Sequence, residues 1–280
     1  MSPSPVRVWA LRTAFRTVGA VAPDVAARWA ETIFCTPPRH TPPVADEEFV
    51  ATGTRFMVQS EGQDIAAWEW GSGPTVLLVH GWGSRAGRFR AVAMALLERG
   101  FRVVAHDAPA HGRSTGRFAT LPEFARALRA VADRSGEIHG LVGHSLGGAA
   151  ACLAMRGGLA ARRLVLVAPP SDVVEFSTTF GDYLRIPTRA RLVMRRNLET
   201  RLSMRWEDLN IAVIARELTV PALIVHDRED EEVSFAHGEE IAHAFPHGRL
   251  VTTTGLGHRA ILRDPEVVRA TVAFLREGIG

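Results

Sequence analysis

The sequence of 280 residues contains no lysine, although it has 33 basic residues, all of them arginine. The arginines are scattered along the whole chain and the formal net charge is only +3, so the composition argues against a nucleic-acid partner. Arginine without lysine indicates a coding bias toward GC-rich codons more than a binding function.

Cysteines and long apolar runs are also scarce. The two cysteines, Cys35 and Cys152, lie far apart, which argues against a disulfide framework. No run of about twenty apolar residues occurs, and the N-terminus lacks an uninterrupted apolar segment of the signal-peptide type, so we expect a cytoplasmic protein. The eleven histidines lack close metal-ligand spacing, so no metal and no cofactor are predicted.

The clearest motif is Gly-His-Ser-Leu-Gly-Gly at residues 143–148. It follows a strand-like apolar run ending at Val142 and leads directly into a helix-forming run from Ala149 to Met155. A Gly-x-Ser-x-Gly pattern at a strand-to-helix turn is typical of a nucleophile elbow, where flanking glycines let the backbone pass closely. Ser145 is therefore the candidate nucleophile. Because a serine hydroxyl is weak at neutral pH, this hypothesis requires a base, an acid and an oxyanion site elsewhere.

Candidate partners follow other strand-like runs. One run closes in His-Gly-Trp-Gly-Ser at residues 80–84, a loop that can direct a backbone N–H at a developing oxyanion. A second run is followed by the acidic segment 227–233, and a third precedes Gly-Leu-Gly-His-Arg at residues 255–259. The chain therefore carries a serine, then an acid, then a histidine.

These motifs, in this order, resemble those of the α/β-hydrolase fold superfamily. The resemblance extends over residues 75–260 and rests on five segments: the loop at 80–84, Asp-Ala-Pro-Ala-His-Gly-Arg-Ser at 107–114, the elbow at 143–148, the acidic turn at 227–233 and the glycine-flanked His258. It implies a doubly wound, mostly parallel eight-stranded sheet and a small helical cap over the active site.

The resemblance also implies a role for each matched residue. Ser145 is expected to attack a carbonyl carbon, and His258 to take its proton and later protonate the leaving group. The backbone N–H groups of Trp82 and Leu146 are the expected oxyanion donors. Asp230 is our choice for the carboxylate that fixes the tautomer of His258.

Two other aspartates stay open as the acid. Asp230 precedes Val233 as the family's acid usually does, although Ser234 stands where a proline often follows. Asp227 lies nearer the end of its strand, and Asp172 follows the preceding strand-like run. The spacing alone leaves both as alternatives.

Five further polar residues have a structural interpretation. We expect His144 to pack beside the elbow and His80 to shape the oxyanion loop through hydrogen bonds. Asp107, His111 and Ser114 resemble the family's structural loop after the fourth strand, so they are interpreted as scaffold.

We predict an N-terminal helical extension with a proline-rich linker at residues 1–43 and an α/β-hydrolase domain at 44–280. Two strands at 54–59 and 64–70 are expected to form an antiparallel edge. Strand and helix patterns then alternate, as in a doubly wound sheet: strands at 75–80, 102–106, 138–142 and 164–168, and helices at 87–99, 121–135 and 146–156.

Two helical segments flank or interrupt this core. The first, residues 6–35, divides near Pro23 and begins with a basic amphipathic stretch. Packing against the hydrolase body or a second copy is the favoured role, and contact with a membrane surface or targeting is the alternative. The second, at about 172–218, occupies the position of the family's cap. Its aromatic residues are expected to pack or to line an acyl pocket, and its arginines to be solvated or to attract acidic substrates.

The expected function is hydrolysis of a small-molecule carboxylic ester or thioester. The same triad also serves amide or carbon–carbon bond hydrolysis, acyl transfer and peracid formation, and a membrane-associated lipase is a further alternative. A non-catalytic ligand-binding protein is the rival from another class. Haloalkane dehalogenases and epoxide hydrolases are disfavoured because they use a carboxylate where this chain has Ser145.

Overall fold

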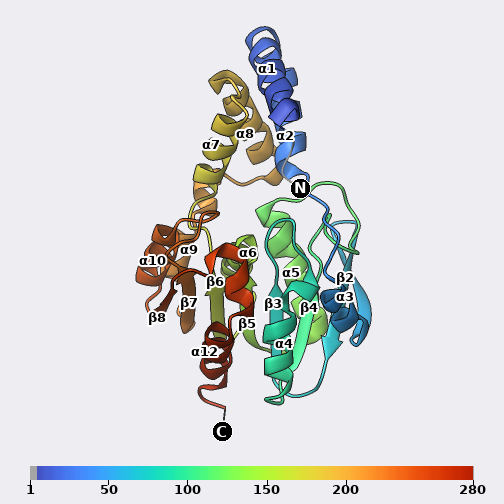
Figure 1. Cartoon of the computed structure of the whole chain (residues 1–280), viewed down its shortest axis with the longest axis vertical. Helices are drawn as coiled ribbons and strands as arrows, with labels where there is room; N and C mark the ends of the chain where they lie inside the picture. Colours follow the sequence, from blue (N-terminus) through green and yellow to red (C-terminus); the bar gives the residue numbers. More distant parts are fainter. Residues whose placement is uncertain (1–4, 280) are drawn as a thin grey trace. The chain divides into compact units, whose positions relative to one another are not determined.

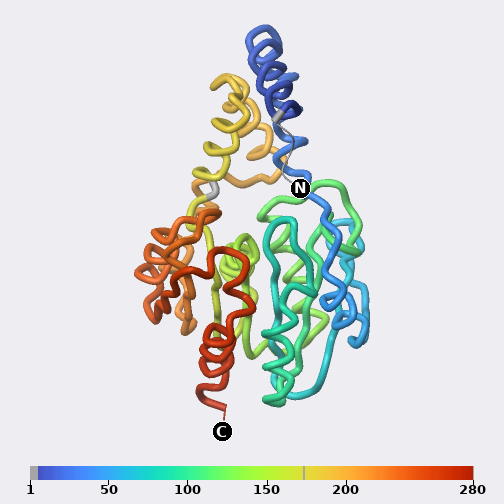
Figure 2. The backbone as a smooth tube through the Cα atoms, viewed as in Figure 1, coloured from blue at the N-terminus to red at the C-terminus, as the bar shows by residue number. Residues whose placement is uncertain are grey.

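The computed structural model describes residues 5–279, which form two compact units. The sheet unit contains residues 37–171 and 211–279, and the helical unit contains residues 5–36 and 172–210. Figures 1 and 2 trace the chain through both. The first four residues of the predicted extension lie outside the described range. The helical unit thus joins the rest of that extension to much of the predicted cap, while the domain boundary at residue 43 stays a prediction.

A mostly parallel sheet forms the centre of the sheet unit, with eight strands in the described residues (Figure 1). Its spatial order is β1-β2-β4-β3-β5-β6-β7-β8. Strand β2 pairs antiparallel with β1 and β4, and all other pairs are parallel, which confirms the predicted fold class and the antiparallel edge. The strands are β1 (Thr54–Ser60), β2 (Gln63–Trp70), β3 (Thr75–Val79), β4 (Arg102–His106), β5 (Ile138–His144), β6 (Arg163–Val167), β7 (Ala222–Asp227) and β8 (Gly248–Thr253).

The inner strands are buried on both faces because helices cover both faces of the sheet. Every residue of β3 is buried, as expected for a parallel strand between two helical layers. Val76, Leu78 and Val142 belong to one core cluster together with residues of α4 and α12. The helices and turns of this unit are α3 (Val44–Ala51), η1 (Ala86–Phe89), α4 (Arg90–Leu97), α5 (Leu121–Ser135), α6 (Leu146–Arg156), α9 (Ile211–Glu217), α10 (Phe235–Ala244), α11 (Gly257–Ala260), η3 (Ile261–Arg263) and α12 (Pro265–Arg276).

The carboxyl ends of the parallel strands collect the predicted site residues. The loop at residues 80–84 follows β3, Ser145 follows β5, and the acidic turn at 227–233 begins where β7 ends. His258 lies in α11, shortly after β8. Since parallel strands bring their carboxyl ends to one edge of a sheet, residues far apart in sequence meet there.

The helical unit consists of α1 (Pro5–Val21), α2 (Pro23–Cys35), α7 (Val173–Tyr183), α8 (Thr188–Leu202) and η2 (Trp206–Leu209). Helix α2 packs on α8, and Asn197 Nδ2 donates a hydrogen bond to Glu31 Oε1 (2.6 Å). Arg12 Nε donates to the Tyr183 carbonyl oxygen (2.7 Å). The N-terminal extension therefore packs against the inserted helices of its own chain. None of the helices in the described part of the chain has the length and apolar character needed to cross a membrane.

Aromatic and charged side chains of this unit serve its own packing. The ring of Phe34 lies 5.1 Å from that of Phe180 and 6.3 Å from that of Trp206, measured between centroids. Arg191 pairs with Asp182 (2.7 Å), while Arg195 forms ion pairs with both Glu199 and Glu207. These contacts agree with the packing interpretation of the aromatic residues, and they engage Arg191 and Arg195 in ion pairs within the helical unit.

Candidate active site

Ser145 occupies a strained turn between β5 and α6. Its φ of 53° and ψ of −128° lie outside the regions that a non-glycine residue favours, and such strain is a feature of nucleophile elbows. The neighbouring glycines are required by close packing. A Cβ at Gly147 would lie 2.1 Å from the Val79 carbonyl oxygen, and one at Gly143 would lie 2.5 Å from Gly148 Cα. The local sequence therefore fits a sharp strand-to-helix turn.

The loop at residues 80–84 passes directly beside the serine side chain. A Cβ built on Gly81 would lie 2.8 Å from Ser145 Cβ and 3.3 Å from its Oγ. The Trp82 amide follows immediately, and Leu146 opens α6, so its N–H belongs to the first turn, which has no intrahelical acceptor. The two predicted oxyanion donors thus come from segments that touch at Ser145, and their role stays a prediction.

Asp230 and His258 form a buried hydrogen-bonded pair. Asp230 Oδ2 lies 2.8 Å from His258 Nδ1, while its Oδ1 accepts from the N–H groups of Glu232 (2.8 Å) and Val233 (2.9 Å). Burial by itself raises the pKa of Asp230. Contacts from His226 and His258 and the Val233 N–H outweigh burial and hold this pKa well below its usual range, so the carboxylate is charged at neutral pH.

The two alternative aspartates make other contacts. Asp227 Oδ2 accepts from Thr253 Oγ1 (2.6 Å) and from the Leu256 N–H (3.1 Å), so this side chain anchors the segment leading to His258. Burial raises the pKa of Asp227, but these hydrogen bonds lower it by more. Asp172 Oδ1 accepts from the Val174 N–H (2.7 Å) and caps α7. Of the three candidates, Asp230 is the one hydrogen-bonded to His258.

His144 connects the elbow to the histidine. Its Nε2 lies 2.8 Å from the His258 carbonyl oxygen, and the two rings are 4.8 Å apart between centroids. Burial lowers the pKa of His144 to about 3, so the neutral ring donates this hydrogen bond and transfers no proton at neutral pH. Within residues 5–279, Ser145 Oγ makes no hydrogen bond to His258. Such bonds are often long before substrate binds.

Two further histidines support the loop at residues 80–84. His80 Nδ1 donates to the Gly81 carbonyl oxygen (2.7 Å), and its Nε2 accepts from the Ala108 N–H (2.9 Å). His111 Nε2 accepts from the Gly83 N–H (2.9 Å). Burial lowers the pKa of His80 well below its ordinary value and that of His111 to about 4, so both rings are neutral. These contacts fit the structural roles predicted for them.

Asp107 and Ser114 organise the adjoining loop. Asp107 Oδ1 accepts from the Ala86 N–H and Oδ2 from the Arg113 N–H, both at 2.8 Å. Ser114 Oγ donates to the Asp107 carbonyl oxygen (2.5 Å). A Cβ at Gly112 would lie 2.0 Å from Asp107 Oδ2, so only glycine fits there. These side chains contact backbone, as expected of scaffold.

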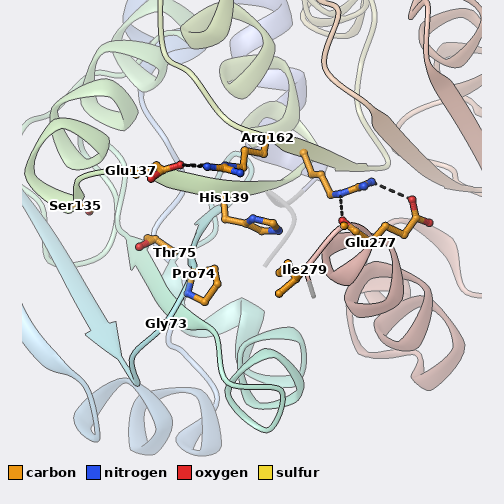
Figure 3. Close-up of a pocket in the computed structure, with 11 residues that line it drawn as sticks. Gly73, Pro74, Thr75, Ser135, Glu137, His139, Arg162, Glu277 and Ile279 are labelled. Carbon is orange, nitrogen blue, oxygen red and sulfur yellow. Dashed lines mark hydrogen bonds and ion pairs between the residues drawn. The ribbon is translucent and has the colours of Figure 1, made fainter.

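A cavity of about 680 Å³ lies at the opposite edge of the sheet (Figure 3). It is lined by residues at the amino ends of β3, β5 and β6 and by the last turn of the chain. Its charged side chains neutralise one another: Arg162 pairs with Glu137 (2.5 Å) and Arg163 with Glu277 (3.0 Å). His139 Nε2 contacts the Leu275 carbonyl oxygen. None of the predicted catalytic residues borders this cavity.

No group of three or more potential ligands in the described chain has the arrangement of a metal site. The cysteines are both buried and unbridged. Burial raises the pKa of Cys152 to about 12, so its thiol is protonated and unreactive at neutral pH.

Comparison with known proteins places the chain in a family. A family model described as serine aminopeptidase, S33, matches residues 73–208, and one described as TAP-like protein matches residues 207–279. An esterase structure from Pyrococcus furiosus is similar with a TM-score of 0.68 at 20% identity, covering 88% of this chain and 100% of that one. The chain belongs to the α/β-hydrolase fold superfamily, which confirms the resemblance found in the sequence.

Two curated relatives differ in how much of the chain they match. A bifunctional esterase/perhydrolase of Acinetobacter calcoaceticus is 35% identical over 100 residues, which cover 33% of this chain and 36% of the relative. The chain thus matches about a third of that relative's length. A pimeloyl-[acyl-carrier protein] methyl ester esterase of Nitrosomonas europaea is 24% identical, covering 70% of this chain and 93% of the relative.

Proposed function

We propose that this α/β-hydrolase cleaves a carboxylic ester or thioester through an acyl-enzyme on Ser145, with His258 as the base and Asp230 as its orienting acid. The observation that carries the proposal is the buried Asp230–His258 hydrogen bond of 2.8 Å, held against the elbow by His144. Together with the strained Ser145, it supplies a nucleophile, a base and an acid at one edge of the sheet.

The geometry supports a definite proton path. Because Asp230 Oδ2 is an acceptor, the hydrogen of the neutral His258 ring lies on Nδ1, and its Nε2 keeps a lone pair. That lone pair takes the Ser145 proton as Oγ bonds to the carbonyl carbon. The resulting imidazolium gives the proton to the leaving oxygen or sulfur as its bond to the carbon breaks. Water then repeats the sequence on the acyl-enzyme and releases the acid.

Charge on the carbonyl oxygen requires donors that are fixed in advance. The Trp82 and Leu146 amides are suited to this because glycine packing sets both of their segments: Gly81 contacts Ser145, and Gly147 contacts the end of β3. Removing one such donor in other hydrolases costs about 3–4 kcal/mol in transition-state stabilisation. The neutral His80 and His111 rings hold the 80–84 loop in place.

The ester class is supported by the names of the relatives. The Nitrosomonas europaea protein is a methyl ester esterase, and the Pyrococcus furiosus protein is an esterase. The fold itself hosts many reactions, so the leaving group must be tested directly.

The test is hydrolysis of matched p-nitrophenyl esters and thioesters of two to eight carbons by wild type, Ser145→Ala and Ser171→Ala. Ser171 is the matched control because its hydroxyl also contacts a histidine, His237 (2.7 Å), but it belongs to the segment after β6 and not to the elbow, and it is 1% exposed. We expect Ser145→Ala to lose about a millionfold in kcat and Ser171→Ala to keep its turnover. Equal turnover by wild type and Ser145→Ala, at equal folding, would contradict the proposal.

A second candidate reaction is peracid formation by the same acyl-enzyme, favoured by the similarity to the esterase/perhydrolase. Here hydrogen peroxide replaces water: its oxygen bonds to the acyl carbon, the bond to Ser145 Oγ breaks, and His258 transfers the proton to the serine. Peroxide at constant ester concentration is expected to yield peracid at the expense of carboxylic acid. If only carboxylic acid forms at every peroxide concentration, this candidate fails.

A further inference from the structure

His226, the second-last residue of β7, has one ring nitrogen beside the proposed acid. Its side chain is fully buried, and Nε2 lies 3.0 Å from the Val233 carbonyl oxygen and 3.5 Å from Asp230 Oδ2. Both neighbours are hydrogen-bond acceptors, since Asp230 is ionised. A bare nitrogen at this position would face two oxygen lone pairs, so the ring hydrogen lies on Nε2.

The other side of the ring fixes its charge and position. His226 Nδ1 is buried and has no hydrogen-bond partner within the described residues. A second hydrogen, on Nδ1, would be a buried donor without an acceptor, so the ring carries its single hydrogen on Nε2. A Cβ at Gly238 of α10 would lie 2.4 Å from Nδ1 and 2.9 Å from His226 Cβ. Glycine at this position therefore makes room for the imidazole.

We propose that His226 is a positioning residue for the acid: its Nε2–H holds Val233 and the Asp230 carboxylate in the geometry that Asp230 needs to orient His258. This inference rests on the proposed function. The Val233 contact closes the turn, because the Val233 N–H donates to Asp230 Oδ1 while its carbonyl accepts from His226. Val233 is thus held at its N–H by Asp230 and at its carbonyl oxygen by His226.

The negative charge on Asp230 Oδ2 interacts with two histidine rings. Asp230 Oδ2 faces His258 Nδ1 at 2.8 Å and His226 Nε2 at 3.5 Å. Without the His226 N–H, more of that charge interacts with His258. This stabilises the protonated form of His258, so the acid limb of the pH–activity profile moves to higher pH. Charged or titratable groups near His258 include His144, whose Nε2 contacts the His258 carbonyl oxygen, Arg88, which donates to the Arg259 carbonyl oxygen, and the Arg259–Glu232 ion pair.

The test compares His226→Leu, which removes the donor, with His226→Gln, whose amide N–H can take the place of Nε2–H. Gly238→Ala displaces the ring without changing it, and His243→Leu, on the exposed side of the same helix, is the control. For His226→Leu we expect kcat to fall about tenfold, the rate equivalent of one hydrogen bond, with KM unchanged. The acid side of its kcat/KM profile should move to higher pH.

His226→Gln should recover most of the rate and the wild-type profile, Gly238→Ala should resemble His226→Leu, and His243→Leu should match wild type. A loss that is equal at every pH and is not recovered by glutamine would overturn the positioning role and leave a purely structural one. Wild-type kinetics in His226→Leu would overturn both the positioning role and the purely structural role.

Imidazole ¹⁵N NMR of the unreacted protein separates this inference from the proposed function. We expect His226 to be a neutral ring with its hydrogen on Nε2, and we expect the Nδ1–H signal of His258 to shift in His226→Leu. A hydrogen on His226 Nδ1, or an unchanged His258 signal, overturns the inference even if no ester is hydrolysed. An inactive wild type with the expected NMR signature contradicts the proposed function instead.

Discussion

Replacing Asp230 by asparagine should disable the site while leaving its loop intact. Asp230 Oδ1 accepts from the N–H groups of Glu232 and Val233, and only an oxygen can do so. The asparagine oxygen therefore keeps this position, and the amide NH₂ takes the place of Oδ2, 2.8 Å from His258 Nδ1. Because an NH₂ group is a donor, His258 is forced to carry its hydrogen on Nε2 and can no longer accept the serine proton.

The expected loss is large because the wrong tautomer is populated, not because the fold changes. The corresponding change in a serine protease triad costs about 10⁴ in kcat, equivalent to about 5 kcal/mol. We expect a fall of about a thousandfold or more for Asp230→Asn, with KM nearly unchanged. The assay is ester hydrolysis at neutral pH, with the melting temperature measured alongside.

Asp227→Asn is the matched control. It disturbs the contacts with Thr253 and Leu256, so it should lower the melting temperature and reduce kcat by only about tenfold. If Asp230→Asn keeps more than a tenth of the wild-type rate while Asp227→Asn is inactive, Asp227 is the acid and the reasoning is refuted.

Three further outcomes follow from the structure. Hydrogen bonds lower the folded-state pKa of Asp230 and Asp227. The ionised carboxylates therefore stabilise the fold above the ordinary carboxyl range, and this stability is lost as pH falls below about 4. Denaturant titration should show that Asp230→Asn loses less stability than wild type over this pH range. Gly147→Ala should abolish activity and soluble expression, because its Cβ would meet the Val79 carbonyl oxygen at 2.1 Å; an active, stable variant would refute the close packing. Deleting residues 1–36 should lower soluble yield, since α8 loses the cover of α2. Unchanged stability with lost binding to anionic vesicles would instead favour the membrane-associated lipase.

Local chemistry made much of the sheet unit predictable. The helix expected at 121–135 coincides with α5 because Pro122 suits its first turn and Gly136, with a φ of 82°, ends it. The elbow was predictable because Gly143 and Gly147 permit contacts that no other residue allows around Ser145. In these segments the constraint lies within a few residues of sequence.

Other features depend on contacts that the sequence does not reveal. No pattern predicts α3, an eight-residue helix whose Asp46 faces Arg90 of α4 at 3.7 Å. Likewise, Glu31 and Asn197 are 166 positions apart, so the packing of the N-terminal extension on the inserted helices could not be deduced from either segment alone.

At the site, the choice of Asp230 as the acid and the contact of His226 with it also depend on spatial contacts that the sequence does not reveal. Asp227 ends β7 and Asp230 lies three residues later, so spacing left them as alternatives, whereas the turn directs only Asp230 to His258. His226 could not be identified from the sequence because a histidine near the end of a buried strand has no motif of its own. The signal that identifies it is spatial: Gly238, twelve positions later, leaves room for its ring.

The central claim, an activated Ser145, is tested most directly by intact-mass spectrometry after exposure to a fluorophosphonate. Wild type should gain one adduct, Ser145→Ala none, and Asp230→Asn should react far more slowly than Asp227→Asn. Folded wild-type protein that gains no adduct, or an equal adduct on Ser145→Ala, would contradict the account.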